Sequence, residues 1–367
     1  MRNRASAVLL APVIPALTTA FADTPNAQAI VPLAIVVPAL VLALFSPIAG
    51  WLADRFGRRS MLIAALAVYS VVGTAPMWLA TLPQIILSRG LPGVCESIIV
   101  ISSTALIGDC FFGPDREKWL AAQAGISALS AILFIVIGGA LGEHGWRAPF
   151  AAYGIAVFFI IPILMFIREP QRHEQPQVAQ KVDYRLFGWI SLIAILSSIM
   201  FMVVPIQIGF LLAAQGITSP QMIGLATAAG SLAVPVGAYM FRRLSHRPFA
   251  LLGAAGLVFM AVGLAIMAKS PSFGVTVAGS IVHGFGWGIG LPTVLTWARA
   301  QLHFDLRGRG TGVFMAAVFV GQFISPVAVI GLQAATGALT SAVLVMAGLA
   351  LIAGVLTAIF VRRLRGV

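Results

Sequence analysis

Long apolar stretches, separated by short polar segments, follow one another along almost the entire chain. A helix needs about 20 mainly apolar residues to cross the roughly 30 Å hydrocarbon layer of a membrane. Runs such as VLALFSPIAGWLA do not alternate apolar and polar residues, which excludes the strands of a transmembrane β-barrel. We predict twelve transmembrane helices, at residues 5–21, 30–50, 61–80, 83–107, 119–142, 148–167, 187–211, 221–241, 249–268, 272–298, 310–334 and 338–361.

The first apolar stretch, residues 5–21, follows two arginines and therefore also has features of a secretory signal. Pro12 and Pro15 interrupt it, and eleven further stretches follow, so we interpret it as a membrane span. Its residues reach only about 26 Å at a rise of about 1.5 Å each. The helix is therefore short, which leaves open that its natural start lies upstream of Met1.

Charge supports this interpretation and sets the orientation. The chain is 60% hydrophobic and only 9% charged, with a net charge of +12. Of its 23 basic residues, all but Arg89, Arg147 and Lys269 fall at the chain ends or in one alternate set of loops. This is the positive-inside asymmetry of a membrane protein, with both termini in the cytoplasm. The same distribution argues against a nucleic-acid partner.

Enzymatic chemistry and bound cofactors find no support in the sequence. Cys95 and Cys110 lie on one predicted helix, about 22 Å apart along its axis, which is too far for a disulfide. The sequence has no phosphate-binding loop, no HExxH and no zinc-ligand spacing. The glycines of HGFGWGIG, at 283–290, lie in an apolar span, where small residues allow helices to pack closely. We expect no enzyme activity, no metal and no cofactor.

The longest polar stretch, REPQRHEQPQVAQKVDYR, divides six spans from six. We therefore predict an N-terminal bundle (1–167), a cytoplasmic central loop (168–186) and a C-terminal bundle (187–367). GWLADRFGRR, which follows the second span, has a counterpart in GAYMFRRLSH after the eighth span, at an offset of 187 residues. Such internal repetition is typical of carriers, which bind substrate between their halves.

The segment GWLADRFGRR also resembles the signature loop between helices 2 and 3 of the major facilitator superfamily, G-x-x-x-D-R-x-G-R-[RK]. Every defined position matches, at Gly50, Asp54, Arg55, Gly57, Arg58 and Arg59. Further similarities are Arg89 with Gly93, Asp109 at the end of span 4, and GWRAPF at 145–150. The resemblance implies an all-α membrane protein with two pseudo-symmetric six-helix bundles, working by alternating access.

The resemblance also implies a role for the loop as a latch on the cytoplasmic side. Asp54 would cap the start of helix 11 near Gly310, and Arg58 would pair with Asp109. A helix N-terminus carries roughly half a positive charge, worth about 0.3 to 2 kcal/mol to a nearby anion, which suits a reversible switch. Phe241 stands at the position equivalent to Asp54 in the second half, so we expect one half alone to carry the latch. The alternative is that the arginines serve only to orient the chain.

Three ionisable residues lie well inside predicted spans: Arg89, Glu96 and His283. Charge is costly there, so each should face a cavity or a partner. Arg89 and Glu96 share a polar stripe along one helical face with Gly93 and Ser103. Adding the repeat offset of 187 residues to position 96 gives position 283, so Glu96 and His283 occupy equivalent places in the two halves. We predict that Glu96 or His283 carries a coupling proton, while Arg89 tunes Glu96 or attracts an anionic substrate group. The alternatives are purely structural roles for Arg89 and His283.

The sequence thus predicts a monomeric secondary transporter in a bacterial inner membrane, with a small organic substrate and H⁺ as its partners besides the bilayer. Few charges and several aromatic residues on the expected cavity helices, such as Phe201, Phe210 and Trp287, favour efflux of a partly apolar compound. The antiporter motif of helix 5 is degraded, because Phe134 and Ile135 replace its Gly-Pro pair. This favours the alternative of a symporter or facilitator that imports a metabolite. A sensor or scaffold without transport activity is the third possibility.

Overall fold

The computed structural model describes residues 9–111, 113–167, 169, 184–300 and 307–364, and those residues form helices and turns without any strand. The all-α prediction is therefore confirmed for this part of the chain. Two compact units make up the protein, Met1–Pro176 and Gln177–Val367. The point that divides them falls within the predicted central loop.

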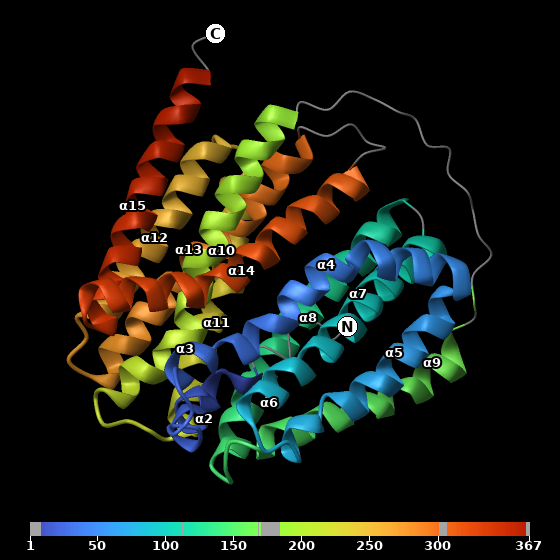
Figure 1. Ribbon diagram of the computed structural model, residues 1–367. Helices are drawn as coiled ribbons and strands as arrows, with labels where there is room; N and C mark the ends of the chain where they lie inside the picture. The colour runs from blue at the N-terminus through green and yellow to red at the C-terminus, as the bar shows by residue number, and fades with distance from the viewer. Residues whose placement is uncertain (1–8, 112, 168, 170–183, 301–306, 365–367) are drawn as a thin grey trace. The chain divides into compact units, whose positions relative to one another are not determined.

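The described elements of the N-terminal unit begin with a short 3₁₀-helix and end with a span of two helix types. Figure 1 labels the α-helices of both units. They are η1 (Ala11–Val13), α2 (Ile14–Ala20), α3 (Ala27–Ile30), α4 (Leu33–Phe56), α5 (Arg58–Val72), η2 (Ala75–Met77), α6 (Leu82–Ser88), α7 (Gly90–Cys110), α8 (Gly113–Gly142), η3 (Ala148–Phe159) and α9 (Ile160–Phe166). The C-terminal unit contains α10 (Tyr184–Ala213), α11 (Pro220–Leu244), α12 (Phe249–Ala268), α13 (Phe273–Ala300), α14 (Arg307–Thr336) and α15 (Leu339–Leu364).

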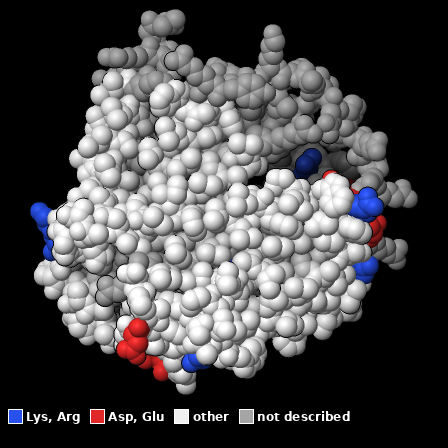
Figure 2. All heavy atoms as spheres, in the orientation of Figure 1, with Lys and Arg blue, Asp and Glu red and all other residues white. Residues whose placement is uncertain are grey.

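Eleven membrane-length apolar helices lie within the described residues, and they correspond to the second to twelfth predicted spans. The first predicted span is described only from residue 9, where η1 and α2 form the shorter apolar helix Ala11–Ala20. Large apolar side chains are exposed on the outside, including Leu44, Phe158 and Leu349. Figure 2 shows that most of the Lys, Arg, Asp and Glu atoms in view lie toward the margins of the face drawn, with a broad uncharged area between them. Such a surface suits contact with lipid rather than water.

Helix α7 in the N-terminal unit packs against α4 and α5, and α13 in the C-terminal unit packs against α11 and α12. The partners thus follow the same chain order in both units, as expected of repeated halves. Glycines allow the close approach of α13 to its neighbours. A Cβ atom at Gly284 would collide with the Gly230 carbonyl on α11, and one at Gly256 on α12 would press on the Gly286 carbonyl. The prediction that HGFGWGIG is a packing segment is confirmed.

Two predicted spans of the N-terminal unit depart from a regular α-helix. The fourth span is interrupted at Arg89, between α6 and α7. Pro92 lies just beyond this point and has no N–H to donate to the carbonyl four residues earlier, which weakens the helix there. The sixth span starts as the 3₁₀-helix η3, with Pro149 in its first turn. In a 3₁₀-helix, side chains three residues apart eclipse one another, so Phe150 and Tyr153 lie on one buried face.

Candidate functional site

The loop that joins α4 to α5 is a tight turn at Gly57. This residue has φ +92° and ψ +138°, a conformation that side chains other than glycine rarely adopt. It ends α4 and starts α5 within one residue, so the charged residues on either side are brought close together. The two glycines of the signature differ in this respect, because Gly50 lies inside α4 and a Cβ there would meet no described atom within 4 Å.

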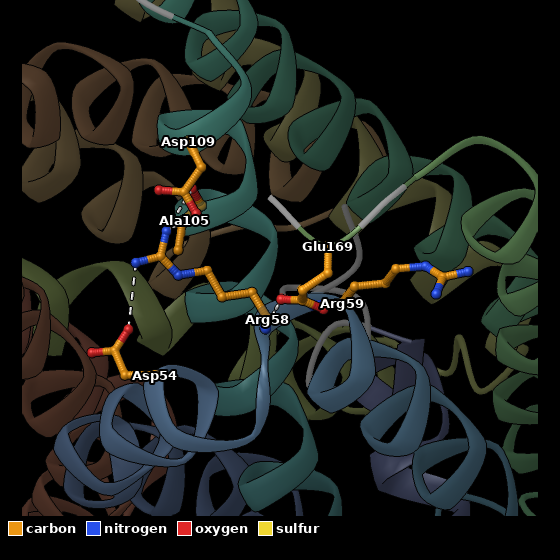
Figure 3. Close-up of polar contacts among 6 residues, drawn as sticks. All are labelled: Asp54, Arg58, Arg59, Ala105, Asp109 and Glu169. Carbon is orange, nitrogen blue, oxygen red and sulfur yellow. Dashed lines mark hydrogen bonds and ion pairs between the residues drawn. The ribbon is translucent and has the colours of Figure 1, made fainter. Parts of the chain in front are cut away.

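Arg58, the first residue of α5, reaches across to the end of α7 (Figure 3). Its guanidinium forms an ion pair with Asp109 through Nη1, which also donates to the Ala105 carbonyl at 3.4 Å. Its Nη2 donates to Asp54 at 3.4 Å, and the Asp54 side chain is 61% exposed, against 23% for Asp109. The structure therefore contains the predicted Arg58–Asp109 pair. The Asp54 contact is long and solvated, so we expect it to contribute little to stability.

Glu169, just after α9, lies between the backbones of Arg58 and Arg59, whose side chains leave in opposite directions (Figure 3). One Glu169 oxygen accepts from the Arg58 amide at 2.5 Å, and the other accepts from the Arg59 amide at 3.0 Å. The first N–H groups of a helix have no partner within the helix, and they attract negative charge. Glu169 therefore caps α5 from a distant segment. The Arg59 guanidinium strengthens this link, because Nη2 donates to the Leu164 carbonyl at 3.1 Å.

Arg55, the remaining arginine of the predicted loop, lies near two aromatic rings. The Arg55 guanidinium lies 5.6 Å from the ring centroid of Trp51 and 5.8 Å from that of Phe56, and all three side chains are exposed. Cation–π contacts of this kind occur where basic and aromatic side chains gather at a membrane surface. The contact of Asp54 with the helix start near Gly310 stays a prediction, since the side chains of residues 307–311 lie outside the described part.

Arg89, at the break between α6 and α7, is completely buried. Nη2 donates to the Tyr153 hydroxyl at 2.5 Å, and Cζ lies 4.9 Å from the Tyr153 ring centroid and 5.7 Å from that of Phe150. Among the described residues, no hydrogen-bond partner reaches Nε or Nη1. The guanidinium is therefore held largely by two ring faces, which the 3₁₀ geometry of η3 stacks one above the other with centroids 6.3 Å apart.

Glu96 lies two turns further along α7 and is 2% exposed. The Tyr69 hydroxyl on α5 donates to its Oε1 at 3.1 Å. The ring of Tyr69 packs against that of Tyr153 with centroids 5.3 Å apart. Arg89 and Glu96 therefore belong to one buried cluster, in which two tyrosines from other spans stand beside the two charged groups.

The polar stripe predicted on the fourth span contacts protein in this structure. Arg89 faces η3, Glu96 faces α5, and a Cβ at Gly93 would press on the Pro38 backbone of α4. The Ser103 hydroxyl accepts a hydrogen bond from Gln123 of α8 at 3.1 Å. The helical face that carries the predicted polar stripe is thus shared among four neighbouring helices.

His283, the third predicted membrane residue, lies in the C-terminal unit and is 1% exposed. Nε2 donates to the Met200 carbonyl of α10 at 3.1 Å. The imidazole is nearly parallel to the Phe201 ring at 6.2 Å between centroids, and Phe201 stacks on Trp287 at 4.3 Å. These contacts suit the structural alternative for His283, a hydrogen-bonding residue that joins α13 to α10.

Sequence reasoning missed Glu169, Tyr69 and Tyr153. Glu169 was grouped with the polar central loop, although it follows the sixth span directly. Tyrosine is scarce, with four residues in the chain, so two of them within apolar spans are a usable signal. No group of three or more His, Cys, Asp or Glu side chains that could hold a metal ion occurs among the described residues.

Comparison with known proteins agrees with this architecture. The family model described as Major Facilitator Superfamily matches residues 3–326. Multidrug resistance protein 1 of Bacillus subtilis (strain 168) is 32% identical over 162 residues, which cover 43% of this chain and 42% of that protein. Tetracycline resistance protein, class C, of Escherichia coli is 23% identical over 347 residues, covering 89% of this chain and 86% of that protein.

Solved structures share the fold at low sequence identity. A D-xylose-proton symporter superposes with a TM-score of 0.77 at 15% identity, covering 96% of this chain and 93% of that one. A peptide transporter in complex with alafosfalin gives a TM-score of 0.76 at 14% identity, covering 98% and 92%. At these identities the likeness concerns the fold and not the substrate.

Proposed function

The chain belongs to the major facilitator superfamily, and from this premise we propose that it exports a small, partly apolar organic compound in exchange for protons. The mechanism would be alternating access between two six-helix bundles, at residues 1–167 and 187–367, joined by the loop at 168–186. We place the protein in a bacterial inner membrane, as a monomer with both termini in the cytoplasm. The positive-inside distribution of its basic residues supports that orientation.

The observation that carries proton coupling is the buried cluster of the N-terminal unit. A carboxyl group and a guanidinium, Glu96 and Arg89, are 2% and 0% exposed inside a membrane span. On insertion scales, an arginine or an acid at mid-membrane costs about 2.5 to 3.5 kcal/mol each. Because of this cost, we interpret the two buried groups as residues that function in transport. Glu96 can bind and release a proton, whereas Arg89 keeps its charge throughout. His283 is the second candidate for the proton, and its hydrogen bond to a backbone carbonyl makes it the weaker one.

The export direction rests on the relatives. The tetracycline resistance protein of Escherichia coli and the multidrug resistance protein of Bacillus subtilis carry names that describe resistance. The first of these matches this chain over 89% of its length. Aromatic side chains such as Phe201 and Trp287 in the C-terminal unit suit a substrate with an apolar ring system.

In this proposal the signature loop gates the transporter. In the closed cytoplasmic state, Asp54 would cap the helix that begins near Gly310, while Arg58 stays with Asp109. The exposed Asp54 carboxylate, with its single long contact to Arg58 among the described residues, is available for such a partner. The loop would then act as a latch worth about 0.3 to 2 kcal/mol, small enough for proton or substrate binding to release.

The test is transport into vesicles that contain the purified protein. Candidate compounds, starting with tetracycline, are first selected by their stabilisation of the protein against thermal unfolding. We expect vesicles that are acidic inside to accumulate the selected compound, and vesicles without a pH gradient to equilibrate it only. The Glu96→Gln variant should lose gradient-driven accumulation, while the exposed Glu143→Gln control keeps it.

Other outcomes would contradict the proposal. Accumulation driven by acid outside the vesicles would indicate import with protons. Equal uptake with and without a gradient would exclude proton coupling. The absence of any exchange of labelled compound across the membrane would leave a sensor or scaffold as the better interpretation.

A further inference from the structure

We propose that Tyr69 is a positioning residue for Glu96, and that the packed rings of Tyr69 and Tyr153 connect the Glu96 carboxylate to the Arg89 guanidinium. This inference rests on the proposed function, in which Glu96 carries the coupling proton. It adds two residues of other spans, α5 and η3, to the machinery that sets when that proton binds.

The four side chains form a continuous buried chain of contacts. Tyr69 donates to Glu96 at 3.1 Å, its ring lies 5.3 Å from that of Tyr153, and the Tyr153 hydroxyl accepts from Arg89 at 2.5 Å. Each of the four is at most 5% exposed. Hydrogen bonds in such surroundings are stronger than in water, because little solvent competes for the donors.

The position of Tyr69 is fixed from both sides. Tyr153 lies against Gly73 so closely that a Cβ at Gly73 would collide with its ring. Gly73 follows Tyr69 by four residues, so the same face of this segment that presents the Tyr69 hydroxyl to Glu96 also receives the Tyr153 ring. Tyr153 is in turn stacked on Phe150, 6.3 Å away. The phenol of Tyr69 therefore has little freedom to leave the carboxylate.

A fixed phenol donor favours the ionised form of Glu96 over the protonated form. An ionised carboxylate only accepts hydrogen bonds, so a donor held against it stabilises the charge. On the elements packed around Glu96, its own span also carries Arg89 and Cys95, and η3 carries Tyr153. The remaining ionisable groups lie at the ends of helices, Arg58 and Arg59 at the start of α5 and Asp109 and Cys110 at the end of α7. Helix α4 carries no ionisable residue before Asp54, and α8 carries none after Lys118. The Tyr69 hydroxyl is thus a donor that reaches Glu96 from another span.

The experiment is the Tyr69→Phe variant, which removes one oxygen and keeps the ring against Tyr153. Gradient-driven uptake of the compound selected above is measured as a function of pH. Loss of the hydrogen bond makes Glu96 bind its proton more readily, so the midpoint of the profile should move up by about one pH unit. Tyr239→Phe is the matched control, because the Tyr239 hydroxyl bonds exposed Arg243 on α11, and its midpoint should stay unchanged.

A second variant tests the sign without altering the packing. Fluorotyrosine at position 69 has nearly the size of tyrosine and a more acidic phenol, so it is a stronger donor and should move the midpoint down. In a Glu96→Gln background, which should retain only exchange of labelled compound without a pH gradient, neither change at position 69 should alter the pH dependence of that exchange.

The outcomes separate this inference from the proposed function. If the wild type shows no pH-driven transport, the proposed function itself fails. If the wild type and Glu96→Gln behave as expected but both Tyr69 variants keep the wild-type midpoint, the positioning role is overturned. A shift of the same size in the Glu96→Gln background would also overturn it, because Tyr69 would then act on another group.

Discussion

Gly57→Ala tests whether the turn before α5 and the Glu169 cap form one structural unit. Gly57 has φ +92°, which an alanine adopts only with strain. A Cβ at this position would also lie 3.0 to 3.1 Å from the carboxyl atoms of Glu169. The substitution therefore strains the backbone and displaces the carboxylate that caps α5.

The two contributions can be estimated separately. A residue forced into a sparsely populated backbone region costs about 1 to 3 kcal/mol. Loss of a helix N-cap costs about 0.5 to 2 kcal/mol. Together they amount to about 1.5 to 5 kcal/mol. At roughly 2 to 4 °C per kcal/mol for a domain of this size, we expect Gly57→Ala to lower the unfolding midpoint by about 3 to 20 °C.

Gly145→Ala is the matched control for the strain alone. Gly145 has φ +110°, and a Cβ there would meet no described atom within 4 Å. Thermal unfolding of both variants in detergent should show a larger loss for Gly57→Ala, by about 0.5 to 2 kcal/mol, the share of the cap. In a Glu169→Ala background this excess should disappear. Equal losses in the two glycine variants, or an excess that persists without Glu169, would refute the reasoning.

Two further predictions concern the latch and the glycine packing. Asp54→Asn should favour the inward-open state by roughly 2- to 30-fold, the range that a helix-cap interaction allows. Transport should then fall at normal surface expression, and cysteines that face the cytoplasm should be labelled faster. Unchanged transport and an unchanged labelling rate would count against the latch. Gly284→Ala should lower stability by about 1 to 3 kcal/mol, because its methyl group would force α13 away from the Gly230 carbonyl. Gly274→Ala, at an exposed position on α13 with no described atom within 4 Å of a Cβ, is the control, and an equal change in both midpoints would contradict the packing argument.

Hydropathy located the spans because the bilayer imposes one requirement on all of them, a long apolar helix. It placed helix ends less well. The second span was predicted to end at residue 50, whereas α4 continues to Phe56. Asp54 and Arg55 are polar enough to leave the lipid but remain good enough helix residues to extend the helix into water. For the same reason hydropathy does not distinguish the 3₁₀ hydrogen bonds of η3 from those of an α-helix.

The site was predictable where one local motif specifies it. The family signature contains both Gly57 and Arg58, and the pairing of Arg58 with Asp109 followed from the resemblance. The partners Glu169 and Tyr69 are 110 and 27 residues distant from the groups they bond, at Arg59 and Glu96. Contacts of this kind depend on how helices pack, and a single helix pattern does not record them. The same limit applies to the polar stripe on the fourth span. The pattern on one helical face does not predict which neighbouring helices cover that face.

The two charged clusters of the N-terminal unit, around Arg58 and around Glu96, both contain residues of the same three spans. Arg58 and Tyr69 lie on α5, Asp109 and Glu96 lie on α7, and the sixth span supplies Tyr153 together with the cap that follows it. Two contacts therefore join α5 to α7, Arg58 with Asp109 and Tyr69 with Glu96. They are about 16 Å apart along α5 and about 20 Å apart along α7. A single contact would leave the antiparallel helices free to rotate relative to each other, whereas two contacts at this separation fix their relative rotation. We therefore expect these spans to move together, so that the proton that we propose at Glu96 would displace the signature loop together with the whole three-span body.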